Sequence, residues 1–515
     1  MGPVLFRAGP TGGTHFSSAG TSRFCYEKWR VSHAVLNSVN VRAAHRNIPG
    51  GECVKRKRVL CVLVALGLMA AACGRSGSDT QAEGESGGTP TTAAKNAKCE
   101  GVTLEATDTG VSADTITVQV MADTGSPLAP GLFQGNVDAM QAFEKYINEN
   151  GGIGCRKLKV ETWDSKLTPD EAKNGQLNAC SNALAMVGGN SLFNPDVTTM
   201  DTCADSKGQP TGLANIAALA NDVNEQCSLH SFIIQGTAEP CTADGKPITG
   251  SREFLAFTGQ LDFYKTVSPE LTGLFMVPGD LPTTVQSATY QVVAQEEHGV
   301  DWKGVVKVSG RDEQSAYTPR VQIAKNNNVT YVYNGSNDVA MTSMRREAAA
   351  QGLTSVKVWA CSLACYTDKF IAAGADVEGT YAWMQFLPFE DKGSNDELDT
   401  YLKYNSQPVS WGAQAWQAAV LMQDAIDKIV DTDGPNAITR ASFLAALNGI
   451  DSFDAHGWMG PKDPKGGFSD CMVVLQMGAS GFERAQPTEP GKLDCNPSYV
   501  SKVTLDPVVE AQKIQ

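Results

Sequence analysis

The sequence predicts an α/β protein made of two lobes, each a doubly wound and mostly parallel sheet. Three observations support this prediction. Strand-like and helix-like segments alternate over residues 115–189, the same alternation restarts over residues 304–386, and a stretch with two prolines and a glycine lies between them at residues 275–284. Because strands that alternate with helices form βαβ units, each block predicts its own parallel sheet.

The first block begins with a run rich in β-branched residues at 115–123. An amphipathic helix follows, with apolar side chains at helical spacing over residues 137–147. Residues 157–163 predict the next strand, Pro169 opens the next helix, and residues 183–189 form a third strand.

The second block has the same order of elements. It predicts a strand at 304–310, a helix that starts near Tyr317, a strand at 330–335, a helix at 338–352, and strands at 356–360 and 381–386. The proline-containing stretch at 275–284 is interpreted as a hinge crossing between the lobes. A helix at 411–429 and the stretch 454–471 would return the chain first to one lobe and then to the other.

These segments give a predicted division of the whole chain. In order, it comprises an untranslated or disordered extension at 1–53, a signal peptide at 54–72, a flexible tether at 73–98, the first part of lobe 1 at 99–275, the main part of lobe 2 at 276–389, a return to lobe 1 at 390–453, and mostly lobe 2 with the C-terminal tail at 454–515.

The segment before Cys73 has the features of a secretory signal. Four basic residues at 55–58 precede an apolar run at 59–72 that ends in small side chains. The run is shorter than the roughly 20 residues that cross a bilayer, so a transmembrane helix is the weaker interpretation. A GTG start codon would be read as Val54, and we expect translation to begin there.

Small residues followed directly by Cys73 resemble the bacterial lipobox, although Ala70 stands where the lipobox prefers Leu. The resemblance implies cleavage before Cys73 and a lipid attached to its sulfur, so the protein would be extracytoplasmic and anchored to the bacterial cell membrane. An ordinary secretory signal followed by a chance cysteine is the alternative. The polar residues after Cys73 cannot bury enough surface to fold, and we expect them to act as a tether.

The charge of the chain excludes some partners. From Cys73 onward the chain holds 32 lysines and arginines against 54 aspartates and glutamates, a net charge of −22. An acidic surface attracts neither nucleic acid nor an anionic membrane. We therefore expect no nucleic-acid partner and membrane contact only through the lipid anchor. We also expect a monomer.

Ten cysteines follow Cys73, and an even number in an exported protein indicates disulfides. Cys361 with Cys365, and Cys471 with Cys495, are the expected local pairs because each pair brackets a short loop. The remaining connectivity is open. A zinc site at the CxxxC of Cys361 is the competing interpretation, but no second such pair and no nearby histidine completes four ligands. We expect no metal and no cofactor.

Residues 116–165, residues 185–191, the stretch 275–284 and the tail from Cys471 to Cys495 together resemble the type 1 periplasmic binding proteins. The likeness is to the branched-chain amino-acid-binding-protein-like solute receptors of ABC transporters, and it covers nearly all of residues 100–500. It implies a two-lobed clamshell that captures a small polar metabolite, an amino acid or an amide- or carboxylate-like compound, by hinge closure. It also implies an ABC permease with ATPase subunits as partners.

Ligands of open α/β sheets bind beyond the carboxyl ends of the strands, so the loops there supply the candidate ligand residues. They are Asp123, Thr124, Ser126, Asn190, Ser191, Tyr317, Ser362 and Trp383. Tyr317 falls near a position that packs on the ligand in the family. Structural alternatives remain open, because Asp123 could cap a turn, Ser191 could be an N-cap and Trp383 could be core.

One departure from the family concerns the loop at residues 361–365, which reads CSLAC. Amino-acid-binding members carry an acidic residue there that neutralises the ammonium group of the ligand. A buried ammonium without a paired charge is costly. Either Asp123 or another acid supplies the charge, or the ligand is not an amino acid.

Two other functions are alternatives to solute binding. An exported enzyme is disfavoured because the chain has no H-E-x-x-H motif, Walker A loop or G-x-G-x-x-G loop, so we expect no catalysis. A lipid-anchored ligand sensor or protein-binding surface lipoprotein would use the same fold without transport, and fold alone does not separate it from a transport receptor.

Overall fold

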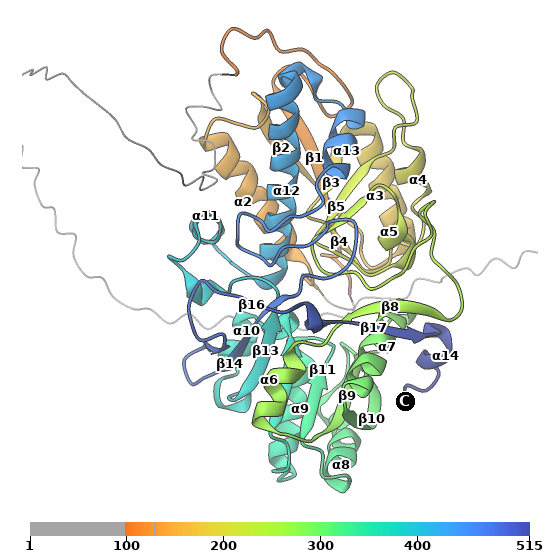
Figure 1. Cartoon of the computed structure of the whole chain (residues 1–515), viewed down its shortest axis with the longest axis vertical. Coiled ribbons are helices and arrows are strands. Elements are labelled where there is room, and N and C mark those ends of the chain that lie inside the picture. The colour runs from red at the N-terminus through yellow and green to blue at the C-terminus, as the bar shows by residue number, and fades with distance from the viewer. Residues whose placement is uncertain (1–97, 128–129) are drawn as a thin grey trace, which may run out of the picture. The chain divides into compact units, whose positions relative to one another are not determined.

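The computed structural model describes residues 98–127 and 130–515 (Figure 1). These residues lie in one compact unit, Ser86–Gln515. The predicted extension, the signal peptide, Cys73 and the tether up to residue 97 lie outside the described residues. Within the described part of the chain, no helix has the length and apolar composition needed to cross a membrane.

The first sheet is entirely parallel and has the order β6-β4-β1-β3-β5-β7, with β2 paired to β1. Its strands are β1 (Thr115–Ala122), β2 (Lys157–Asp164), β3 (Ala185–Val187), β4 (Asn190–Ser191), β5 (Ala214–Ala217), β6 (Leu219–Ala220) and β7 (Ser231–Ile233). Its helices are α2 (Gln134–Glu149), α3 (Pro169–Asn182), α4 (Thr198–Thr202), α5 (Val223–Cys227), α12 (Ser410–Asp433) and α13 (Arg440–Asn448). We call this sheet and its helices the first lobe.

The second sheet has the order β10-β9-β11-β12-β13-β14-β15, with β16 paired to β14. Its strands are β9 (Leu271–Pro278), β10 (Val300–Val308), β11 (Tyr331–Asn334), β12 (Val358–Ser362), β13 (Thr380–Met384), β14 (Cys471–Met477), β15 (Phe482–Gln486) and β16 (Asp494–Cys495). The associated helices are α6 (Gln260–Val267), α7 (Pro282–Glu297), α8 (Thr318–Asn326), α9 (Asp338–Ala350) and α10 (Asp368–Ala372). These elements form the second lobe. β9 to β13 run parallel and β14 to β16 pair antiparallel, so the predicted mostly parallel sheets are confirmed.

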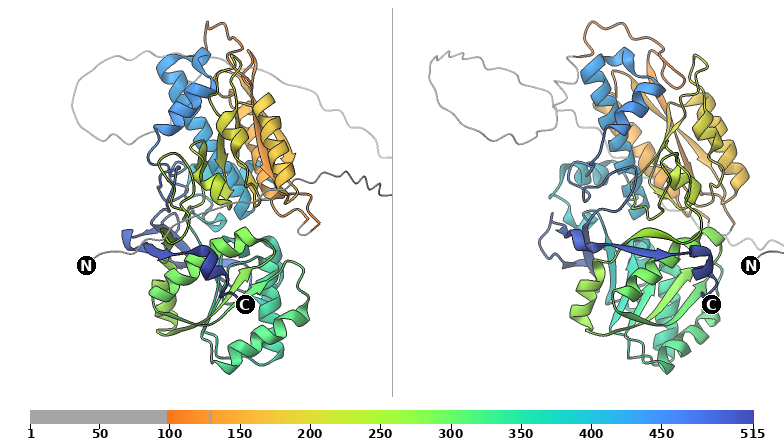
Figure 2. Two further views of the ribbon diagram at one scale, coloured as in Figure 1. Left: turned by 90° about the vertical axis from the view of Figure 1, so that its right-hand side faces the viewer. Right: turned by 45° about the vertical axis from the view of Figure 1, so that its right-hand side comes forward.

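A two-stranded ribbon, β8 (Arg252–Phe257) with β17 (Val500–Leu505), runs antiparallel beside α7, and α14 (Pro507–Ala511) follows it (Figure 2). Its inward side chains, Phe254, Ala256, Val503 and Leu505, form an apolar cluster with Ala294 of α7. The last strand of the chain is thereby fastened to the second lobe.

The chain passes between the lobes three times, at residues 234–251, 385–409 and 449–470. The second passage contains α11 (Asp396–Tyr404). The predicted crossing at 275–284 is wrong, because this stretch is the end of β9 and the start of α7, both in the second lobe. Proline ends a strand and begins a helix equally well, and Pro278 and Pro282 serve these two roles here.

The second lobe therefore begins earlier in the chain than the predicted first-lobe segment 99–275 implies. Leu261 and Tyr264 of α6 pack in one cluster with Phe275 of β9 and Tyr331 of β11. α6 lies between β8 and β9 in the chain, and its local sequence does not show which sheet its aromatic face packs against.

The first and third crossings are joined to each other. Thr237 and Gly467 form a backbone bridge, and Lys462 Nζ donates a hydrogen bond of 2.6 Å to the carbonyl of Ile233, the last residue of β7, directly before the first crossing. Burial lowers the pKa of Lys462 to about 7. These contacts hold the two crossings side by side.

Five disulfides are present in the described residues: Cys99–Cys155, Cys180–Cys203, Cys227–Cys241, Cys361–Cys365 and Cys471–Cys495. The two predicted local pairs are confirmed. Cys227–Cys241 ties the first crossing to α5 of the first lobe, so a covalent link stands at the entrance to that crossing.

Candidate ligand-binding cleft

A cavity of about 880 Å³ lies between the two lobes. Residues that follow β4 and β6 in the first lobe line it, together with residues that follow β9, β11, β12 and β13 in the second. The carboxyl ends of the parallel strands of both sheets therefore open into the same space, which is where α/β sheets bind ligands.

The wall from the first lobe is formed by the starts of two helices. Phe133 precedes α2 and is 2 % exposed, and its ring meets the ring of Trp411 edge to face at a centroid distance of 5.4 Å. Trp411 and Gln414 lie three residues apart in the first turns of α12, so their side chains share one helix face. Leu192, after β4, adds a further apolar side chain to this wall.

The wall from the second lobe is built on an aromatic cluster over the sheet. Trp383 of β13 stacks on Phe257 with ring centroids 4.9 Å apart and planes 13° apart. Its indole Nε1 donates to the hydroxyl of Tyr333 in β11 over 3.3 Å. Burial raises the pKa of Tyr333, so its hydroxyl keeps its proton at physiological pH. Both side chains line the cavity and hold each other in place.

The CSLAC loop, residues 361–365, extends from β12 into the cleft. Its ends are closed by the Cys361–Cys365 disulfide, and both cysteines are fully buried. Ser362, Leu363 and Ala364 line the cavity between them. The carbonyl of Leu363 accepts a buried hydrogen bond of 3.1 Å from Ser410 Oγ at the start of α12, so the loop contacts the first lobe directly.

Replacing both cysteines of this loop by serine (Cys361→Ser with Cys365→Ser) should lower the free energy of unfolding by about 2 kcal/mol. A disulfide stabilises the fold by lowering the conformational entropy of the unfolded chain, and this effect is small for so short a loop. The Cys227→Ser, Cys241→Ser pair closes a longer loop and should cost about 3 kcal/mol by the same argument. Urea denaturation measures both, and an unchanged midpoint for the CSLAC variant would contradict the stabilising role.

Ser362 and Trp383 are the two sequence-predicted residues that line the cavity. Ser362 Oγ also accepts the backbone N–H of Ala364 over 3.4 Å. The other six are not among the lining residues: Asp123, Thr124, Ser126, Asn190, Ser191 and Tyr317. Contact between these six and a ligand stays a prediction.

Asp123 is fully buried and joins three loops at the cleft edge. Its Oδ1 accepts hydrogen bonds from Ser165 Oγ (2.6 Å) and from the backbone N–H of Leu167 (2.7 Å), and its Oδ2 accepts from the N–H of Leu192 (2.8 Å). Burial raises the pKa of this carboxyl, against the opposing effect of these hydrogen bonds. Because Leu167 and Leu192 line the cavity, these contacts favour the structural alternative for Asp123.

Tyr317 is 1 % exposed and packs inside the second lobe, with the guanidinium of Arg320 5.0 Å above its ring. Burial raises its pKa to about 12. Thr124 directs its backbone N–H to Asp164 Oδ1 over 3.1 Å. Asn190 and Ser191 are 1 % and 3 % exposed within β4.

The charged side chains of the cavity are four aspartates and one lysine: Asp138, Asp280, Asp338, Asp368 and Lys369. Two of the aspartates hold loops. Asp280 accepts from Ser309 Oγ and from the N–H of Gly310, and Asp338 accepts from Thr367 Oγ1 over 2.6 Å. The most buried lining residues are apolar or amide side chains.

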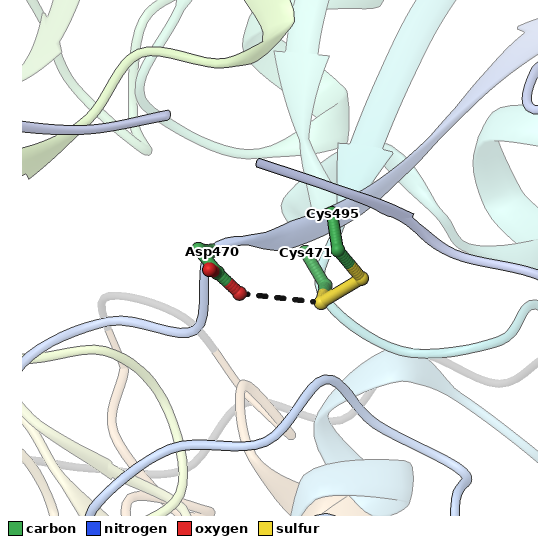
Figure 3. A group of neighbouring side chains, drawn as sticks. All are labelled: Asp470, Cys471 and Cys495. Atoms are coloured by element: carbon green, nitrogen blue, oxygen red, sulfur yellow. Dashed lines mark hydrogen bonds between the residues drawn. A yellow bond between two sulfur atoms is a disulfide. The ribbon is translucent and has the colours of Figure 1, made fainter. Parts of the chain in front are cut away.

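In the described part of the chain, one group of three residues has side chains of the kinds that bind metals: Asp470, Cys471 and Cys495 (Figure 3). Cys471 and Cys495 are joined as a disulfide, and Asp470 Oδ1 lies 3.4 Å from Cys471 Sγ. Disulfide sulfurs are not thiolates, which are the cysteine form that binds metals. The cluster therefore reads as a structural link between β14 and β16.

The family model described as periplasmic binding protein matches residues 271–482. The solved structure of an ABC transporter substrate-binding protein from Aeropyrum pernix superimposes with a TM-score of 0.57, covering 78% of this chain and 100% of that one at 13% identity. This chain has the type 1 periplasmic-binding-protein fold. The resemblance drawn from the sequence, and its two-lobed α/β architecture, are confirmed.

Two further structures share this fold. A fatty acid ABC transporter substrate-binding protein from Thermomonospora curvata is 16% identical, with a TM-score of 0.53 over 78% of this chain and 96% of that one. A leucine-binding protein from Thermotoga maritima is 14% identical, with a TM-score of 0.52 over 76% of this chain and 99% of that one. A comparison with curated proteins gave no match.

Proposed function

We propose that this chain is the extracytoplasmic solute-binding protein of an ABC importer. It captures a small molecule between its lobes and presents the closed form to a permease with ATPase subunits. A lipid on Cys73 holds it at the cell membrane. The match of the periplasmic binding protein family model to residues 271–482, and the structural similarity to an ABC transporter substrate-binding protein and a leucine-binding protein, support this proposal.

The observation that carries the proposal is the interlobe cavity itself. It has the size of a small-molecule site, and both sheets direct their carboxyl ends into it. The lobes are connected by three crossings and also touch across the cavity, where Ser287 Oγ of α7 donates to Asn221 Oδ1 over 3.2 Å. A ligand that bridges the lobes would favour the closed arrangement, as in hinge closure generally.

A thermal-shift screen of the full-length protein tests the proposal. The panel contains amino acids, amides, organic acids, fatty acids and polyols. A ligand present at about 100 times its Kd should add about 2.7 kcal/mol to the free energy of unfolding and raise the melting temperature accordingly.

The Trp383→Ala variant should lose most of this ligand-induced shift, because the indole forms part of the cavity wall. The matched control is Trp302→Ala, which removes a partly buried tryptophan of the second lobe that is not among the cavity-lining residues. If no compound in the panel changes the melting temperature of the unmodified protein, the solute-binding proposal is wrong.

A further inference from the structure

Three amide atoms on the first-lobe side of the cavity have no hydrogen-bond partner among the described residues: Gln414 Oε1, Gln235 Oε1 and Asn221 Nδ2. Gln414 is 4 % exposed, so water reaches it poorly. A buried polar atom without a partner is costly, and native proteins rarely leave one unpaired. A ligand group is the partner that a binding cavity can supply.

The three atoms include both kinds of hydrogen-bonding group. Gln414 Oε1 and Gln235 Oε1 are acceptors, and Asn221 Nδ2 is a donor whose neighbouring Oδ1 already accepts from Ser287. The complement of such a set is a group that offers N–H and C=O together. A carboxamide has that pattern and carries no charge.

The charges around the cavity disfavour a carboxylate. Lys369 is the single basic side chain among the described lining residues, and it is exposed. Four aspartates face the same space, and the chain as a whole carries a net charge of −14. A ligand carboxylate would enter a negative field and find no buried cation as a partner.

An ammonium group finds no carboxylate among the most buried lining residues either. Asp280 and Asp368 are exposed, and Asp138 and Asp338 are half-buried at the starts of α2 and α9. The CSLAC loop contains no acidic residue, and its Leu363, which lines the cavity, is 6 % exposed. The most buried lining residues thus suit a neutral group.

Four aromatic side chains give the cavity wall broad apolar faces in both lobes. Phe133 and Trp411 line it from the first lobe, and Trp383 and Tyr333 from the second. Aromatic faces of this kind bind planar or branched apolar groups through their surface area. The body of the ligand is therefore apolar, with its polar group directed toward α12.

We propose that the cleft selects an uncharged carboxamide-type compound with an apolar body, its amide bound by Gln414 and its body held between the tryptophans of the two lobes. This inference rests on the proposed solute-binding function and names the class of solute.

Two matched sets of probes test the ligand class on the full-length protein. One is benzamide, benzoate and benzylammonium, and the other is hexanamide, hexanoate and hexylammonium. Each set changes only the head group. The amide should bind at least about tenfold more tightly than both charged members, measured by calorimetry and by tryptophan fluorescence.

A variant of Gln414 tests whether this residue binds the head group of the ligand. Gln414→Glu replaces the amide by a carboxylate of nearly the same shape and should weaken amide binding by about tenfold or more, with a relative gain for the ammonium probe. Gln141→Glu is the matched control, since Gln141 is exposed on α2 and does not line the cavity. This control should leave the order of binding affinities within each set of three probes unchanged.

The outcomes separate the inference from the proposed function. If benzoate or benzylammonium binds as tightly as benzamide, or if amino acids bind and both amides do not, the neutral-ligand inference is wrong while solute binding stands. If neither these probes nor the wider panel binds, both are wrong. The comparison on the unmodified chain decides the ligand class even if Gln414→Glu fails to fold.

Discussion

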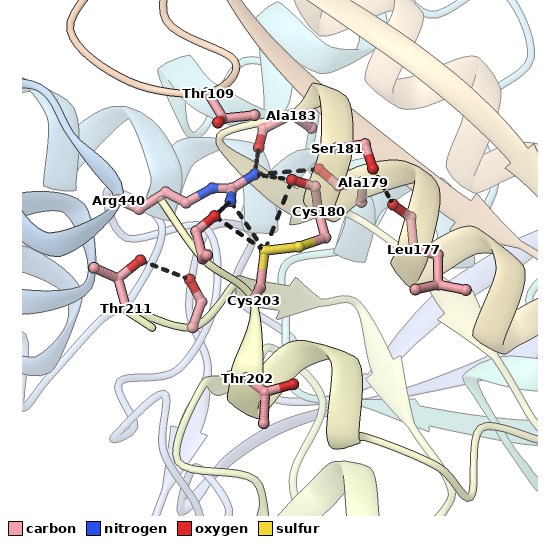
Figure 4. Close-up of a disulfide and its surroundings, with 12 residues drawn as sticks. Thr109, Leu177, Ala179, Cys180, Ser181, Ala183, Thr202, Cys203, Thr211 and Arg440 are labelled. Carbon is pink, nitrogen blue, oxygen red and sulfur yellow. Dashed lines mark hydrogen bonds between the residues drawn. A yellow bond between two sulfur atoms is a disulfide. The ribbon is translucent and has the colours of Figure 1, made fainter. Parts of the chain in front are cut away.

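Arg440→Met should lower the free energy of unfolding by about 4 kcal/mol, because it removes a buried charge that serves several buried acceptors. The side chain is 1 % exposed and reaches from the start of α13 to the end of α3 (Figure 4). It donates to the carbonyls of Ala183 (2.6 Å), Cys180 (2.7 Å) and Ala204 (2.6 Å).

The position of Arg440 explains the size of this effect. The last carbonyls of a helix have no partner within it, and a cation there also offsets the helix dipole. The guanidinium lies 2.9 Å from Cys203 Sγ of the Cys180–Cys203 disulfide, so the charge and the disulfide secure the same end of α3. Methionine fills the space but leaves these carbonyl oxygens without donors.

Urea denaturation by circular dichroism measures the loss. Arg440→Lys should be intermediate, because it keeps the charge but cannot donate in several directions from a planar group. Arg311→Met, at an exposed position, is the control and should change the free energy of unfolding by less than about 0.5 kcal/mol. A loss for Arg440→Met no greater than that of the control would rule out this role.

Most of the fold could be predicted because the two βαβ blocks carry regular local patterns. The helix predicted from apolar residues at 137–147 is α2, with Val137, Met140, Phe143 and Ile147 all buried. The hinge could not be predicted in the same way. Proline and glycine mark a turn between a strand and a helix as strongly as a crossing between lobes, and the choice at 275–284 depends on which sheet β9 joins.

The disulfides show the same limit. A pair separated by 4 residues can be expected from spacing, and the pair separated by 24 follows from its shared loop. Cys99 and Cys155 are 56 residues apart and meet because of how the first lobe folds. Their pairing is a property of tertiary structure and leaves no local signal.

The candidate site was predicted at the level of loops rather than of side chains. The strand ends were identified, and Ser362 and Trp383 do line the cleft. Asp123 has the residue type of a ligand-binding group, but three donors from neighbouring loops occupy its oxygens. Gln414 was missed because it lies among alanines in a helix with a core-like pattern, and only the fold shows that the start of α12 faces the cavity.

Asp391→Ala should also cost about 4 kcal/mol, because it leaves Arg484 charged and buried without its partner. The side chains of Asp391 and Arg484 are 2 % and 7 % exposed. Arg484 Nε donates to Asp391 Oδ1 over 2.7 Å, its NH2 group donates to Oδ2, and the N–H of Gly491 also donates to Oδ2 over 2.9 Å. Asp391 lies in the second crossing and Arg484 in β15, so the pair fastens that crossing to the second lobe.

An exposed pair of the same chemistry provides the comparison. Asp376 binds Arg346 over 2.6 Å, but its side chain is 44% exposed and that of Arg346 52%. Asp376→Ala should therefore cost less than about 1 kcal/mol, because water already screens this pair. The double variant Asp391→Leu with Arg484→Met should recover most of the loss, since it removes both buried charges together. If the double variant is as unstable as Asp391→Ala in urea denaturation, the unpaired charge of Arg484 does not cause the loss of stability. The cause would then be the loss of packing between the second crossing and β15.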